Sequence, residues 1–178
     1  PEQQVDFGGA LFSPASDELV ATYYVGDRRR VYPKSDEWSA DLTFLQQQLP
    51  NMELSLESIT TDEPPALVST HSDVNPGATY LFNRSAQTIE KLYGAWPALP
   101  SEHLVSVTPI RYAARDGVEI PAYLTLPKGV PSENLPVIIF PHGGPWGRDS
   151  WGYSPVAQFF ANRGYAVLQP NFRGSAGY

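Results

Sequence analysis

The chain has 178 residues, 42% of them hydrophobic and 12% aromatic, a composition that supports a packed core and excludes a disordered chain. It has no cysteine, which excludes disulfide scaffolds and thiolate metal sites and leaves the cellular compartment open. The net charge of −7 is uneven, since residues 1–100 carry −8 and residues 101–178 carry +1. We therefore expect no nucleic-acid partner, and without an apolar run of transmembrane length we expect no membrane span.

Residues 1–93 contain two similar stretches of short strands. Residues 19–22 (Leu-Val-Ala-Thr) and 31–32 (Val-Tyr) correspond to residues 67–70 (Leu-Val-Ser-Thr) and 80–82 (Tyr-Leu-Phe). Turns are expected at residues 61–65 (Thr-Asp-Glu-Pro-Pro) and 75–77 (Asn-Pro-Gly). The offsets of 48 and 49 residues lie within the period of β-propeller blades, so the spacing predicts blades for this part. A hairpin of residues 80–83 and 88–93 is expected to follow.

One helix is predicted at about residues 36–49. Four apolar residues fall on a single helical stripe: Trp38, Leu42, Leu45 and Leu49. Ser35 or Asp36 can cap the start, and Pro50 closes the end. We expect this helix to pack on the side of a blade.

The pattern changes after a proline-containing linker at residues 94–103. Asp116-Gly117 lies between two β-rich runs, residues 107–113 and 120–126, which predicts a hairpin. The run 137–140, a helix at 155–163 and a strand at 165–169 then form a strand, helix, strand series. Such a series predicts two parallel strands in one sheet, here within residues 104–178.

The run from Pro136 to Pro145 is the most informative stretch of the chain. Its four apolar residues, 137–140, predict a strand that is buried on both faces, and Pro141 ends the pairing. Gly143 and Gly144 let the backbone bend closely around a bound atom. A His-Gly-Gly turn after a strand is typical of the oxyanion loop of α/β-hydrolases, in which a backbone N–H stabilises the negative oxygen formed during acyl transfer. We assign His142, Gly143 and Gly144 to this loop, with Gly144, or Gly143 beside it, as the donor.

No catalytic residue is assigned in the chain. His142 resembles a base, but in this fold the nucleophile, acid and base all follow the oxyanion strand, so we expect it to shape the loop. Ser175 lies in Arg173-Gly-Ser-Ala-Gly177, where a nucleophile elbow would need glycine in place of Arg173. We therefore expect Ser175 in a loop at the carboxyl edge of the sheet.

The remaining polar residues indicate no metal or cofactor. His71 and His103 are expected to be surface or structural histidines, and Arg148 is expected to pair with Asp149 on the surface. The cluster Arg28-Arg29-Arg30 is interpreted as a solvated edge. No His, Asp or Glu group has metal-site spacing, and no glycine loop matches a phosphate cradle.

Residues 134–178 resemble the start of the catalytic domain of the prolyl oligopeptidase family of serine peptidases, in its acylaminoacyl-peptidase and dipeptidyl-peptidase-like branch. Three motifs carry the resemblance: residues 141–152 (Pro-His-Gly-Gly-Pro-Trp-Gly-Arg-Asp-Ser-Trp-Gly), 162–168 (Asn-Arg-Gly-Tyr-Ala-Val-Leu) and 171–178 (Asn-Phe-Arg-Gly-Ser-Ala-Gly-Tyr). The resemblance implies a mixed fold, with all-β propeller blades in 1–93, a linker in 94–103 and the truncated N-terminal part of an α/β-hydrolase domain in 104–178.

The same resemblance implies a parent enzyme that cleaves short peptides through a Ser-Asp-His triad. The triad is expected after Tyr178, so the chain itself should be inactive. Trp146, Arg148 and Trp151 are candidates for a pocket wall, with packing and surface roles as the alternative.

Two other functions stay open from the residues. A carboxylesterase or lipase also uses His-Gly-Gly, although a third glycine in place of Pro145 would favour it more. A β-rich interaction module without enzymatic activity is the second alternative. Because the hydrolase part holds only half a sheet, we expect the remainder of that domain, or a second copy of the chain, to cover its open strand edges.

Overall fold

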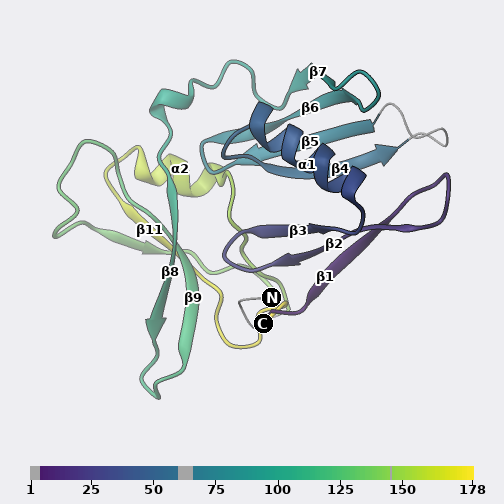
Figure 1. Ribbon diagram of the computed structural model, residues 1–178. Helices are drawn as coiled ribbons and strands as arrows, with labels where there is room; N and C mark the ends of the chain where they lie inside the picture. The colour runs from purple at the N-terminus through teal and green to yellow at the C-terminus, as the bar shows by residue number, and fades with distance from the viewer. Residues whose placement is uncertain (1–4, 60–65, 145) are drawn as a thin grey trace. The chain divides into compact units, whose positions relative to one another are not determined.

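The computed structural model describes residues 5–59, 66–144 and 146–178 (Figure 1). The turn expected at residues 61–65 and Pro145 lie outside these ranges. By their contacts the residues form two compact units, one of Pro1–Ser72 with Pro76–Pro97 and one of Asp73–Asn75 with Ala98–Tyr178. The described residues contain no helix that is both long and apolar enough to cross a membrane.

The first unit consists of two sheets and one helix. Its elements are β1 (Phe7–Phe12), β2 (Leu19–Val25), β3 (Arg29–Pro33), α1 (Asp36–Gln48), β4 (Glu53–Ile59), β5 (Ala66–Ser72), β6 (Asn75–Asn83) and β7 (Thr88–Gly94). The sheets have the strand orders β1-β2-β3 and β4-β5-β6-β7, so that neighbours in sequence are neighbours in space. Such meanders are the repeating element of a β-propeller.

One expected turn in this unit is wrong. Residues 75–77 do not form a turn but begin strand β6, and the chain turns at Asp73 and Val74 instead. Proline is tolerated at the start of a strand, where its missing N–H breaks no central pairing. Gly77 allows a close approach of two strands there, because a side chain would meet the Thr70 carbonyl oxygen at 2.9 Å.

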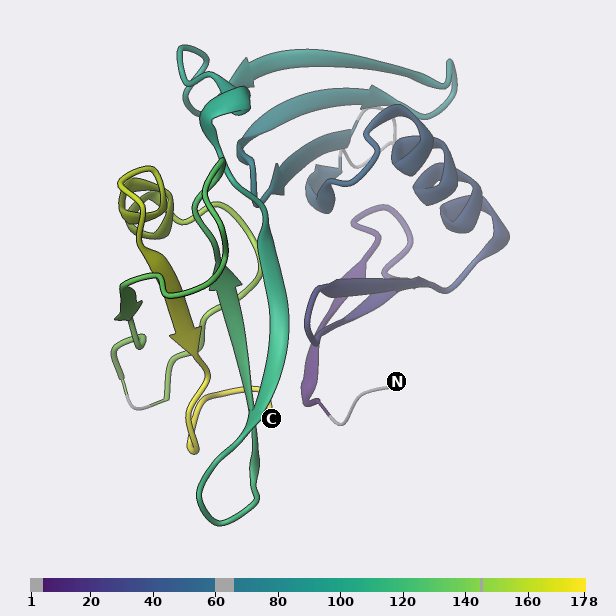
Figure 2. The ribbon, with the colours of Figure 1, turned by 90° about the vertical axis from the view of Figure 1, so that its left-hand side faces the viewer.

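Helix α1 lies against one face of the β4–β7 sheet (Figures 1 and 2). Its start is capped by Ser35, whose hydroxyl accepts a hydrogen bond from the Trp38 N–H at 3.3 Å. Leu45 packs with Val68 and Phe82 in the core of the sheet. Of the predicted stripe, Trp38 and Leu45 are buried, and Trp38 packs with Val20 and Ala21 of β2.

The second unit is built on a four-stranded sheet. Its elements are the 3₁₀ turn Ser101–His103, β8 (Val107–Ala113), β9 (Glu119–Thr125), β10 (Val137–Ile139), α2 (Pro155–Ala161) and β11 (Ala166–Pro170). The strand order is β10-β11-β9-β8. Strands β8 and β9 form the antiparallel hairpin around Asp116-Gly117, and β10 pairs with β11 in parallel, as the strand, helix, strand pattern predicts.

Strand β10 differs from its prediction. Figure 2 shows it as a short arrow at the edge of its sheet, beside yellow β11. Its side chains are not buried on both faces, since Val137 is 57% exposed and Ile139 58% exposed. Val137 and Ile139 point to the same face of the sheet, so it is this face of β10 that the described residues leave uncovered.

Candidate functional site

The oxyanion-loop residues follow the carboxyl end of β10. Backbone pairing continues one residue past the strand, where the Phe140 N–H donates to the Leu168 carbonyl at 2.8 Å. The loop then leaves the sheet at the edge where β11 also ends. The carboxyl ends of parallel strands are where ligands bind in α/β proteins, so the topology places His142, Gly143 and Gly144 at a usual site position.

The backbone of this loop offers free donors. The N–H groups of Gly143 and Gly144 donate to no acceptor within residues 5–59, 66–144 and 146–178. Gly144 has φ +146, and a side chain there would meet the Gly147 and Trp146 nitrogens at 2.8 Å. Glycine is therefore required at 144, and the bend it allows leaves two N–H groups for an external acceptor.

His142 is fixed to the segment that follows β11. Its Nε2 lies 2.7 Å from the Ser175 hydroxyl oxygen, and its Nδ1 lies 2.8 Å from the Gly143 carbonyl oxygen. The imidazole also stacks on the Phe172 ring, with ring centres 4.5 Å apart. The structure thus brings together two residues that the sequence analysis treated separately, His142 and Ser175.

Ser175 is buried, with 8% of its surface exposed. Its hydroxyl lies 2.6 Å from the Phe172 carbonyl oxygen, to which it donates. A nucleophilic serine instead donates its proton to a histidine and is open to substrate. The contacts of Ser175 are those of a structural hydroxyl at the end of a turn.

A second set of contacts joins the same two loops. The Asp149 N–H donates to the Asn171 side-chain oxygen at 2.7 Å, and the Asn171 amide returns a bond to the Asp149 carbonyl at 3.0 Å. Arg148 donates to the Tyr178 hydroxyl at 2.8 Å and lies over its ring. The Ala176 N–H donates to the Gly147 carbonyl at 2.9 Å. The segments 142–149 and 171–178 therefore form one hydrogen-bonded platform.

The surface pair expected between Arg148 and Asp149 is not what the structure contains. Asp149 is half-buried, and its Oδ1 accepts a hydrogen bond from Gln169 at 3.1 Å. Its Oδ2 is buried with no hydrogen-bond partner among the described residues. Burial raises the pKa of the Asp149 carboxyl, against the Gln169 hydrogen bond and the nearby charge of His142, which lower it.

The outer end of the platform is tied to the β8–β9 hairpin. Arg173 donates to the Asp116 carboxylate, which holds the pKa of that carboxyl below its usual value. Both side chains are exposed, so this ion pair orients the segment more than it stabilises the fold.

The three pocket-wall candidates lie in different environments. Trp146 is 82% exposed beside the loop, and Arg148 is held by Tyr178. Trp151 is buried, packs with Val107 and Tyr123, and donates to the Val107 carbonyl at 3.1 Å. The packing alternative thus describes Trp151, and Trp146 is the candidate whose ring is free to meet a ligand.

The other two histidines belong to other elements. His71 is in β5 beside Glu53, whose carboxylate is 3.5 Å from its Nε2, and His103 ends the 3₁₀ turn. Within the described ranges no three His, Cys, Asp or Glu side chains come close enough together to hold a metal ion.

Sequence reasoning missed the contact between His142 and Ser175, as well as the roles of Gln169 and Asn171. The only signal was position, because both segments follow the carboxyl ends of strands predicted to be parallel neighbours. That rule places the loops together, but it does not say which side chains pair.

No family profile matches the chain. It is 37% identical over 186 residues to dipeptidyl aminopeptidase BIII of Pseudoxanthomonas mexicana, covering 99% of this chain and 27% of that protein. It is 30% identical over 197 residues to dipeptidyl peptidase family member 6 of Caenorhabditis elegans, with the same two coverages. The chain thus spans about a quarter of the length of these relatives.

Solved structures give the same fold. A prolyl endopeptidase superposes with a TM-score of 0.67 at 19% sequence identity, over 98% of this chain and 25% of that structure. The mixed architecture, with propeller sheets followed by the first strands of a hydrolase domain, is confirmed by this likeness. The comparisons do not favour an esterase or a non-enzymatic module.

Proposed function

Since this chain belongs to the prolyl oligopeptidase family of serine peptidases, we propose that it forms part of an enzyme that hydrolyses short peptides by acyl transfer. In this proposal the chain supplies an oxyanion donor, the N–H of Gly144 or Gly143. The nucleophile, acid and base come from polypeptide outside these 178 residues, as expected from a triad that follows Tyr178.

The observation that carries the proposal is the pair of N–H groups at Gly143 and Gly144, which donate to no acceptor in the part of the chain that the structure describes. A backbone donor is suited to an oxyanion only if it is already oriented and has no competing acceptor. The contacts of His142 with Ser175 and Phe172 meet the first condition, because they fix the residue immediately before the glycines.

The chain on its own is proposed to be inactive. Ser175 is buried and donates to the Phe172 carbonyl, so a fluorophosphonate reagent for active-site serines should leave the 178-residue chain unlabelled. Labelling at Ser175 would overturn this part of the proposal and make His142 its base.

The open edge of the second unit is proposed to be covered in the working enzyme. Val137 and Ile139 expose more than half of their surfaces at the edge strand β10. In this proposal further strands of the hydrolase domain pair with β10 and cover its apolar side chains, which would otherwise face solvent.

The direct test uses a polypeptide that carries this chain together with the nucleophile segment, assayed on a chromogenic dipeptide substrate. Gly144→Ala should lower kcat by about 100- to 1,000-fold with little change in KM, as expected when an oxyanion donor is displaced. Gly129→Ala is the matched control, because Gly129 also has positive φ but lies in a remote, open loop of the same unit. Equal losses in the two variants would contradict the proposed role of Gly144.

A further inference from the structure

We propose that Ser175 and His142 form a positioning pair that holds the oxyanion loop in its active geometry. The inference rests on the proposed function, and it assigns a role to the Arg173-Gly174-Ser175 segment other than that of a nucleophile elbow. Neither residue touches the reacting atoms in this proposal, since both act through the backbone of Gly143 and Gly144.

The direction of the hydrogen bonds carries the argument. The Ser175 hydroxyl has one proton, and that proton points to the Phe172 carbonyl, an oxygen that can only accept. The 2.7 Å contact with His142 must then be donated by the imidazole Nε2–H. Ser175 therefore accepts a hydrogen bond from His142. In a catalytic pair the direction is opposite, because the serine hydroxyl donates to the histidine.

The second imidazole nitrogen ties the pair to the loop backbone. Nδ1 faces the Gly143 carbonyl at 2.8 Å, and that oxygen belongs to the peptide that carries the Gly144 N–H. A ring with hydrogen on both nitrogens makes all three contacts of the cluster, whereas a neutral ring makes two. The Asp149 carboxylate is a charged group near the ring, since the charge of His142 lowers the pKa of that carboxyl.

Neighbouring residues hold the His142 imidazole ring in one orientation. Phe172 stacks on one face of the imidazole, and Gly147 lies so close that a side chain there would meet Nδ1 at 3.1 Å and the Gly143 carbonyl at 2.7 Å. Ser175 is 8% exposed, and its hydrogen bond with the half-buried His142 ring is partly shielded from water. A loop held by one partly buried hydrogen bond and one ring stack should lose its orientation when either partner is removed.

The first experiment observes the pair directly in the 178-residue chain. In proton NMR spectra the His142 Hε2 signal should be visible, because its hydrogen bond to buried Ser175 slows exchange with water. Ser175→Ala should remove the signal by fast exchange, whereas Ser150→Ala, at an exposed position of the neighbouring loop, should keep it. An Hε2 signal that persists in Ser175→Ala would overturn the proposal.

The second experiment measures catalysis in the polypeptide that also carries the nucleophile segment. Ser175→Ala and His142→Ala should each lower kcat about tenfold or more and change KM less than twofold. The double variant should lose no more than the worse single variant, because the two residues act as one unit. Losses that multiply would overturn the pairing.

The two proposals fail in different ways. A wild-type polypeptide without peptidase activity, combined with an Hε2 signal that depends on Ser175, would reject the proposed function and leave the pair as a structural feature. If Gly144→Ala keeps its peptidase activity while Ser175→Ala loses activity, the proposed oxyanion role of Gly144 is rejected. The pair would then not act through Gly144. A labelled Ser175 would reject the positioning pair and the proposal that the nucleophile lies outside these 178 residues.

Discussion

At the scale of single residues, Asp149 differs most clearly from its expected place on the surface. Its carboxyl is half-buried, one oxygen has no partner among the described residues, and its pKa is raised chiefly by burial. A raised pKa means that the folded state binds the proton more tightly than the unfolded state does. The protonated form of Asp149 is therefore the form that the fold prefers.

This preference predicts how stability depends on pH. The contribution of Asp149 is fully present below the ordinary carboxyl pKa of 3.8 and is lost as pH rises through the raised pKa of the folded state. Urea unfolding of the wild-type chain across this range should show that loss, and Asp149→Asn, which does not titrate, should lack it.

Asp116 supplies the matched control with the opposite sign. Its pKa is lowered by the Arg173 hydrogen bond, so its contribution is present above the ordinary pKa and is lost as pH falls through the folded value. Asp116→Asn should therefore remove the loss of stability that occurs as pH falls through the pKa of Asp116. It should leave unchanged the loss of stability that Asp149 causes as pH rises. A difference between wild type and Asp149→Asn that does not change with pH would contradict the interpretation.

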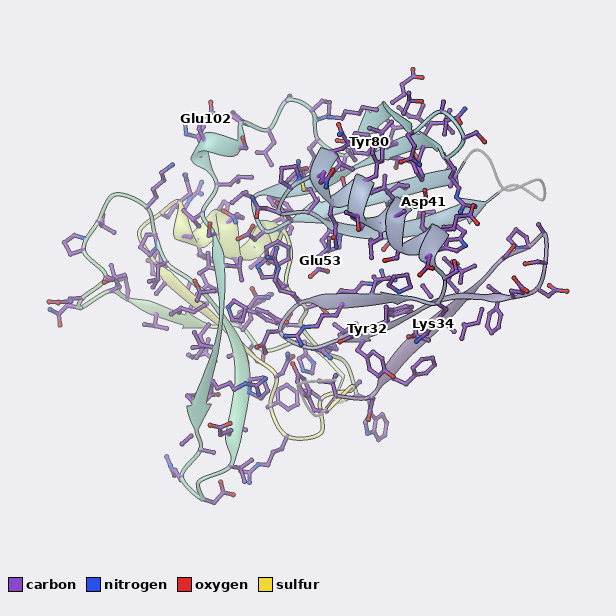
Figure 3. The ribbon with its side chains drawn as sticks, viewed as in Figure 1. Tyr32, Lys34, Asp41, Glu53, Tyr80 and Glu102 are labelled. Atoms are coloured by element: carbon purple, nitrogen blue, oxygen red, sulfur yellow. The ribbon has the colours of Figure 1, made fainter. Side chains whose placement is uncertain are left out.

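At the scale of elements, helix α1 is attached to the β6–β7 hairpin by a buried ion pair. Asp41, labelled on the helix in Figure 3, accepts from Arg84 Nε at 2.6 Å, and both side chains are 6% exposed. The guanidinium also lies 4.0 Å from the Trp38 ring centre and 2.7 Å from Glu37, which is 70% exposed. Of the two acids, Asp41 is the one that compensates a buried charge.

We expect Asp41→Ala to lower the free energy of unfolding by about 3–5 kcal/mol, because buried Arg84 loses its buried carboxylate partner. Glu37→Ala should cost no more than about 1 kcal/mol, since its carboxylate is solvated. Asp41→Leu combined with Arg84→Met should recover much of the loss, because no unpaired charge then remains. Urea denaturation measures all three, and equal costs for Asp41→Ala and Glu37→Ala would contradict the assignment.

The helices and strands also show which features of the fold can be predicted from local sequence patterns. The stripe of Trp38 and Leu45 and the Asp116-Gly117 pair predict their helix and hairpin because both signals lie within a few residues of the structure they form. The turn placed at residues 75–77 is wrong because proline and glycine also begin strands. The exposure of Val137 and the bond between His142 and Ser175 depend on strand order, which no local pattern contains.

At the scale of the whole molecule, the open edge at β10 is the feature with the largest consequence for behaviour in solution. Val137 and Ile139 are exposed beside unpaired backbone groups of an edge strand. Such an edge can pair with the same edge of another copy when nothing else covers it.

The 178-residue chain is therefore expected to self-associate, with a mass by light scattering above that of one chain. Ile139→Lys should shift the population toward the monomer, because a charge on an edge strand opposes pairing. Val118→Lys, at an exposed site in the β8–β9 turn, should not. A wild-type chain that stays monomeric at high concentration would contradict the expectation.

The strand order of the second unit also determines the sequence in which its sheet can be completed. Strand β11 follows β8, β9 and β10 in sequence, yet it occupies the place between β9 and β10, pairing Val167 with Thr125 on one side and with Ile138 on the other. Until residues 166–170 have left the ribosome, the β8–β9 hairpin and β10 are separate pieces without a common neighbour. Because β11 joins these pieces, the β8–β11 sheet cannot form before residues 166–170 are available, and β10 has no parallel partner in this sheet until then.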